Sequence, residues 1–131
     1  MLIAVPSKNR AGRTTTDKLL PNLVTFFVPE SEVHQYSYVK NVVGIPNDVQ
    51  GITKTRNWIL KNTNEKRVVM LDDDVKKTAF VKRYSNNVEH VNLKDEVFWY
   101  DEFQKYFDIT EQMNYKIWGV TTDHSTKSAY S

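Results

Sequence analysis

The chain has 131 residues, of which 40% are hydrophobic and 26% are charged, so it can form one domain with a buried core. The absence of cysteine excludes disulfides and thiolate zinc sites, and a formal net charge of +2 does not by itself predict nucleic-acid or membrane binding. The sequence contains no signal-peptide core and no apolar run of membrane-spanning length, so we expect a cytoplasmic protein without a membrane partner.

Short apolar runs alternate with helix-like stretches in the first half of the chain. We predict strands at residues 2–5, 23–28, 41–45 and 67–71. Continuous apolar runs without polar alternation are typical of parallel strands that are covered on both faces. The helical stretches between them predict an α/β domain with a mostly parallel central sheet, spanning residues 1–131.

The clearest predicted helix covers residues 48–63, with Asn47 or Asp48 as its N-terminal cap. Its apolar residues recur at helical spacing: Val49, Ile52, Ile59 and Leu60. Two further helical stretches are predicted, residues 14–20 before the second strand and residues 29–39 after it.

The pattern changes after residue 74. Residues 78–84 and 88–91 predict a hairpin or a strand followed by a mobile turn, and Asn92 is a candidate cap for a long helix. The apolar face predicted for that helix consists of Val97, Tyr100, Phe103 and Phe107. Residues 117–122 predict a final strand.

Three consecutive carboxylates, Asp72, Asp73 and Asp74, follow the fourth predicted strand. In open α/β sheets, ligands bind beyond the carboxyl ends of the strands, so these acids are candidate site residues. If the strand continued through them, Asp72 and Asp74 would point to the same side and Asp73 away. Such oxygen ligands suit Mg²⁺ or Mn²⁺ shared with a substrate phosphate. A purely structural acidic turn is the alternative.

Other nucleotide-binding patterns do not match. The sequence lacks the glycine-lysine motif of a P-loop, and its glycines, at 12, 44, 51 and 119, do not form a dinucleotide fingerprint. An aspartyl phosphatase would usually carry its acids after the first strand, and Lys76 stands where Thr or Val would be expected.

A family resemblance rests on residues 51–75. Gly51, Arg56-Asn57, the following helix and the acidic run resemble the nucleotide-sugar-binding core of GT-A glycosyltransferases, notably the large inverting family. The stretch "IAVPSKNRAGRT" resembles the first strand and exit loop of that fold. Together, "VPSKNRAGR", "TRNWIL" and "MLDDDV" are most similar to phage and TET-associated glycosyltransferases, which are thought to decorate hydroxymethylated pyrimidines in DNA.

The resemblance implies a GT-A fold and a site for a nucleotide-diphosphate sugar, with a UDP-sugar expected, and for Mn²⁺ or Mg²⁺. It assigns the metal to Asp74 and Asp72, and the ribose to Asp72 or Asp73. Arg56 would contact the base or phosphates, and Asn57 would stabilise that corner. The nucleoside pocket would be lined by Pro6, Ser7 and Arg10.

Each role has a structural alternative. Ser7 could only bond a turn, Asn57 could be helix surface, and Arg56 could form a structural ion pair. The helical spacing places Arg56 on the apolar face, which favours a functional role.

The resemblance also bears on the extent and setting of the chain. GT-A enzymes are usually longer, so we expect the donor-binding part of a longer protein, truncated at its carboxyl end. Asp123 is the acid best placed to act as general base. The acceptor implied is modified phage DNA, in the host-cell cytoplasm if the protein is phage-encoded. A non-catalytic nucleotide-binding module that acts through a partner is the alternative function.

Overall fold

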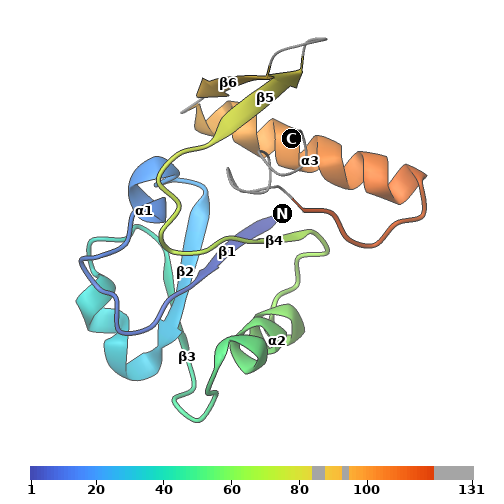
Figure 1. Cartoon of the computed structure of the whole chain (residues 1–131). Coiled ribbons are helices and arrows are strands. Elements are labelled where there is room, and N and C mark those ends of the chain that lie inside the picture. Colours follow the sequence, from blue (N-terminus) through green and yellow to red (C-terminus); the bar gives the residue numbers. More distant parts are fainter. Residues whose placement is uncertain (84–87, 93–94, 120–131) are drawn as a thin grey trace.

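The computed structural model describes residues 1–83, 88–92 and 95–119, and a four-stranded parallel sheet forms its centre (Figure 1). The strand order is β3-β2-β1-β4. The strands are β1 (Leu2–Pro6), β2 (Val24–Pro29), β3 (Val42–Ile45) and β4 (Val68–Met70). The predicted α/β class and parallel sheet are therefore confirmed.

The central strand, β1, shows why these runs lack polar alternation. Ala4 of β1 pairs with Thr25 of β2 on one side and with Met70 of β4 on the other. Residues 3–5 are all buried, because both faces of the sheet are covered. Every residue of this segment must therefore be apolar, whichever face it occupies.

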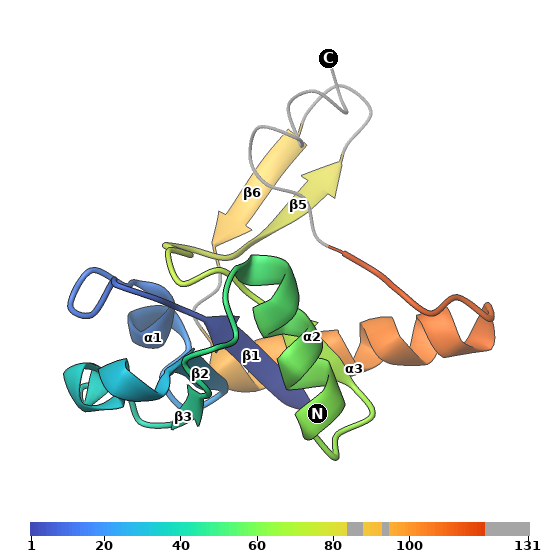
Figure 2. The same ribbon diagram turned by 90° about the horizontal axis from the view of Figure 1, so that it is seen from below.

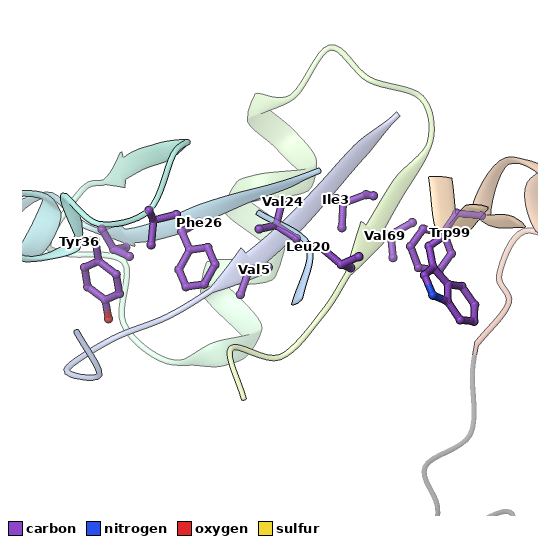
Figure 3. Close-up of a cluster of buried hydrophobic side chains, with 11 residues drawn as sticks. Ile3, Val5, Leu20, Val24, Phe26, Tyr36, Val69 and Trp99 are labelled. Carbon is purple, nitrogen blue, oxygen red and sulfur yellow. The ribbon is translucent and has the colours of Figure 1, made fainter. Parts of the chain in front are cut away.

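Two hydrophobic clusters lie on opposite faces of the sheet. One joins Ile3, Val5 and Val69 to Trp99 and other residues of the long helix α3 (Glu96–Gln112). The other joins Ala4 and Phe27 to Ile59 of helix α2 (Ile52–Asn62). Figure 2 shows the sheet between these two helices. Figure 3 shows the first cluster, with Tyr36 at one end and Trp99 at the other.

The helices agree with the predictions only in part. The short helix α1 (Thr16–Leu19) lies within the predicted stretch 14–20, whereas the stretch after β2 is a 3-10 helix, η1 (Glu30–Tyr36). Helix α2 begins at Ile52 with Gly51 as its cap residue, so the predicted caps Asn47 and Asp48 are wrong. They lie in the turn before the helix.

The prediction of one continuous apolar face for α2 is also wrong. Ile59 is buried, whereas Ile52 and Leu60 are more than half exposed. Val49 does pack against the second cluster, but from outside the helix. Helix α2 begins four residues later than predicted, and it buries a narrower apolar face than the sequence suggests.

Helix α3 begins one turn later than predicted. Asp95 caps it by accepting hydrogen bonds from the backbone N–H groups of Val97 and Phe98, while Asn92, the predicted cap, ends strand β6. Trp99 and Phe103 are the buried residues of α3, and Val97 is 68% exposed. The buried face of α3 therefore includes Trp99, and the prediction that Val97 belongs to it is wrong.

Arg67, directly before β4, ties α3 to the sheet. Its guanidinium forms ion pairs with Asp108 at 2.7 Å and Glu111 at 2.9 Å, and lies 5.5 Å from the centre of the Phe107 ring. These hydrogen bonds raise the pKa of Arg67 above its ordinary value. The contacts fix the far end of α3 against the amino end of β4.

The predicted hairpin is confirmed as strands β5 (Ala79–Arg83) and β6 (Val88–Asn92), which pair antiparallel. Figure 2 shows it projecting away from the four-stranded sheet. Residues 117–119 form no strand, so that part of the predicted final strand is wrong, and residues 120–122 lie outside the described residues. No helix of the described chain is long and apolar enough to cross a membrane.

Candidate active site

A pocket of about 460 Å³ lies at the carboxyl edge of the parallel sheet. It is lined by Pro6, Ser7, Lys8, Arg10, Phe27, Pro29, Ile45, Val49, Gly51, Ile52, Thr55, Asp72, Asp73 and Asp74. Each strand of the sheet contributes its last residues or its exit loop. One wall is apolar, and the three carboxylates form the acidic side.

The three carboxylates occupy a turn and not the strand itself. Strand β4 ends at Met70, and Asp73 and Asp74 form the turn that follows, so the strand-alternation argument for their directions is wrong. Their exposure nevertheless alternates: Asp73 is 8% exposed, whereas Asp72 and Asp74 are exposed. Two acids are thus exposed at the pocket, and the one between them is buried.

Asp73 is held by side chains from the β1 exit loop. The Ser7 hydroxyl donates to its Oδ2 at 2.6 Å, and the Arg10 Nε lies 3.0 Å from Oδ1 and 3.1 Å from Oδ2. This enclosed carboxylate is therefore both neutralised and hydrogen-bonded, which offsets the cost of burying a charge. The side chains of Ser7 and Arg10 are engaged with Asp73, and both residues line the pocket.

The backbone of the acidic turn is held from α1. The N–H groups of Thr15 and Thr16 donate to the Asp73 carbonyl, at 2.9 and 3.2 Å. The Thr16 hydroxyl donates to the Asp72 carbonyl at 2.6 Å and accepts from the N–H of Val75 at 3.0 Å. The turn is therefore anchored on both sides of Asp73 and Asp74, a role that the sequence analysis did not assign to these threonines.

The β1 exit loop is held in turn by η1 and the residues after it. The Tyr36 hydroxyl lies 2.8 Å from the Ser7 Oγ and accepts the N–H of Arg10 at 3.2 Å. The buried Glu32 accepts the N–H of Asn9 at 2.6 Å. Asn9 has a φ of 57°, a left-handed conformation that asparagine tolerates. The sequence predicts only a helix at residues 29–39, and these contacts of Glu32 and Tyr36 with the exit loop were not predicted.

Arg56 and Asn57 lie on different sides of α2. Arg56 is exposed, with its Nη2 3.7 Å from Asp72 Oδ1, so its predicted position on a buried apolar face is wrong. It still lies beside the acidic turn. Asn57 borders a second hollow with Trp58 and Lys61, which adjoins the pocket at Val49, and the pocket-lining residues of α2 are Ile52 and Thr55. Thr55, which directly precedes Arg56 in the sequence, was not predicted as a site residue.

The structure thus brings together six predicted site residues around one pocket: Pro6, Ser7, Arg10, Asp72, Asp73 and Asp74. Arg56 reaches its rim through Asp72, and Asn57 does not line it. Asp123 lies outside the described residues. Within the described part of the chain, no group of three or more acidic or histidine side chains is arranged to hold a metal ion.

A parallel sheet with an acid-lined pocket beyond its carboxyl edge defines an α/β protein of the Rossmann-like ligand-binding class. The family model described as TET-Associated Glycosyltransferase matches residues 1–128. The chain therefore belongs to the TET-associated glycosyltransferase family, and its fold is a Rossmann-like glycosyltransferase fold. Searches of curated proteins and of solved structures gave no match.

Proposed function

We propose that this glycosyltransferase binds a nucleotide-diphosphate sugar, specifically a UDP-sugar, in the pocket at the sheet edge. The observation that carries the proposal is the division of the acidic turn, in which Asp73 is tied to Ser7 and Arg10 while Asp72 and Asp74 remain exposed at the pocket. The apolar wall, which includes Phe27 and Ile45, suits a nucleobase and ribose, and the acidic side suits a cation with the diphosphate.

The pocket offers only part of the ligand set that a divalent cation, Mn²⁺ or Mg²⁺, would need. Asp72 and Asp74 offer hard oxygen ligands, but Asp73 is committed to Arg10. Two carboxylates suit a metal that takes its remaining ligands from phosphate and water, and not one enclosed by protein alone. When bound, the cation supplies compensation for the negative charge that builds on the departing diphosphate.

The reaction proposed is transfer of the sugar to a hydroxyl. The acceptor oxygen bonds to the anomeric carbon as the bond from that carbon to the diphosphate breaks. The acceptor proton passes to a base, and the nucleoside diphosphate leaves with the bonding electrons. Asp123 is the proposed base because it follows the last predicted strand in the sequence, and it lies outside the described residues. The proposed role of the described residues is to hold the donor. Arg56, whose Nη2 lies 3.7 Å from Asp72 Oδ1, is proposed to contact its phosphates.

The proposed acceptor is DNA that carries hydroxymethylated pyrimidines. The family assignment and the exposed cations near the pocket support it. Lys8 lines the pocket, and Lys76 and Lys77 follow the acidic turn. These cations could pair with backbone phosphates while one base presents its hydroxyl to the sugar. Arg10 is engaged with Asp73 and contributes less to such a contact than its sequence position suggests.

Two measurements test the proposal. Calorimetry with UDP in Mn²⁺ and in chelator should show binding that depends on the metal, and equal affinity in both would exclude the bridging cation. Transfer of radiolabelled sugar should then be measured with the full-length protein on hydroxymethylated DNA, unmodified DNA, proteins and lipids. Label only on protein or lipid would exclude the DNA acceptor. Metal-dependent UDP binding without transfer to any acceptor would favour a non-catalytic binding module.

A further inference from the structure

Tyr36 is a polar residue buried in the hydrophobic cluster of the sheet face, and the proposed function leaves it without a role. Its relative exposure is 0%, and its ring packs 6.1 Å from Phe26 and 6.0 Å from Tyr38, measured between centroids. Only its hydroxyl reaches out of the cluster, towards the β1 exit loop, where it meets Ser7 and the N–H of Arg10. Figure 3 shows this residue at the end of the cluster.

The hydrogen bonds around Tyr36 have a defined direction. Ser7 has one hydroxyl proton and donates it to Asp73 Oδ2 at 2.6 Å. The Tyr36 hydroxyl must therefore donate to the Ser7 Oγ across the 2.8 Å contact, while it accepts from the Arg10 N–H. The chain of donors runs from Tyr36 through Ser7 to the Asp73 carboxylate. Burial raises the pKa of the Tyr36 hydroxyl above its ordinary value, so this proton stays in place at neutral pH.

We propose that Tyr36 is a positioning residue of the glycosyltransferase site, which acts through Ser7 and Arg10 to fix Asp73 and the acidic turn. Its hydroxyl orients both groups that hold the Asp73 carboxylate: the Ser7 side chain directly, and Arg10 through its backbone. Because Asp72 and Asp74 flank Asp73 in one turn, fixing Asp73 also fixes the carboxylates that face the pocket. The consequence for donor binding rests on the proposed function, whereas the geometric role does not.

The test uses Tyr36→Phe, which retains the ring in the cluster and removes only the hydroxyl. Tyr106→Phe is the control, because Tyr106 is a tyrosine packed against the same hydrophobic cluster with a raised pKa, but it belongs to α3 and does not line the pocket. Backbone amide resonances of Arg10 and residues 72–74 should be recorded without metal or nucleotide. We expect them to shift in Tyr36→Phe and to remain unchanged in Tyr106→Phe.

Donor binding is the second readout. In Tyr36→Phe, UDP affinity in Mn²⁺ should fall on the order of tenfold, because a buried donor and acceptor pair is lost and the turn loosens. Ser7→Ala should weaken UDP binding as well, and the double variant should be no weaker than the weaker single variant, because the two residues act in one chain. Additive effects would show that Tyr36 does not act through Ser7.

The outcomes separate the two proposals. Unshifted resonances of residues 72–74 in Tyr36→Phe would overturn the positioning role, whatever the affinity. If these resonances shift in Tyr36→Phe but the wild-type protein binds no UDP, the positioning of the turn is supported and the proposed donor is overturned. A merely structural Tyr36 would lower the unfolding temperature without selectively moving these resonances.

Discussion

Arg10 and Asp73, 63 residues apart in the chain, form an ion pair in the pocket wall with N–O distances of 3.0 and 3.1 Å. The pair explains why three consecutive acids can follow a buried strand. The middle carboxylate is enclosed and neutralised, and only its two neighbours retain exposed charge. The acidic run is therefore one structural residue between two residues that are available to a ligand.

Asp73→Asn should destabilise the protein by about 1–3 kcal/mol, because Arg10 loses its partner while solvent around its 40% exposed side chain limits the penalty. Urea denaturation should show a lower midpoint with an unchanged slope. Asp74→Asn is the control, since an exposed acid should change stability by less than about 0.5 kcal/mol. Equal stability of the two variants would contradict the structural role of Asp73.

Asp74→Asn should weaken UDP binding on the order of tenfold in Mn²⁺ and leave binding in chelator unchanged. The substitution retains the shape of the side chain and removes one ligand charge. Calorimetry under both conditions is the measurement, with Asp101→Asn, an exposed acid on α3, as the matched control. A loss of affinity that is the same with and without metal would assign Asp74 to direct contact with the nucleotide.

The strands of the sheet were predictable because each is a largely apolar run that ends at a proline or at polar residues. Burial on both faces accounts for the run in the central strand β1, whereas Val43 of the edge strand β3 is 38% exposed. The difference between Asp73 and its neighbours was not predictable in the same way. It depends on Ser7, which lies 66 residues earlier, and on backbone bonds from Thr15 and Thr16. A local pattern shows three equivalent acids, and only the packed fold makes them different.

The start of α2 shows a second limit of the local pattern. Residues 47–51 contain good capping residues and continue the apolar spacing, so the sequence favoured an earlier start. Gly51 instead has φ 87° and ψ 157°, a conformation essentially limited to glycine, and the helix begins after it. Within the helix, Ile52 and Leu60 are exposed, and Arg56 lies in solvent beside Asp72, so the apolar spacing also overstated the buried face.

Gly51→Ala should destabilise the protein by about 1–3 kcal/mol, the typical cost of that backbone region for a residue with a side chain. No atom lies within 4 Å of the position an added Cβ would take, so the cost is conformational and not steric. Gly119→Ala, where the space is also open and no left-handed φ occurs, is the matched control. Because Gly51 lines the pocket, UDP affinity should fall as well; a variant as stable as the wild type would show that the turn can relax.

Arg56→Ala should weaken UDP binding while changing the free energy of unfolding by less than about 0.5 kcal/mol. The ion pair with Asp72 is long, at 3.7 Å, and both side chains are largely exposed, so it contributes little stability. The same exposure leaves the guanidinium free to turn towards a phosphate at the acidic edge of the pocket. Lys61→Ala is the control, since it removes a cation from the same helix at the second hollow.

Calorimetry and urea denaturation on both variants decide between the two roles of Arg56. A phosphate contact predicts lower affinity in Arg56→Ala alone, with a smaller difference at high salt because exposed charges are screened. A large loss of stability with unchanged affinity would instead make Arg56 a structural partner of Asp72. In that case Asp72 would be paired with Arg56, as Asp73 is paired with Arg10. Of the three carboxylates in the described turn, only Asp74 would remain available to a cation, and the proposed metal site needs two.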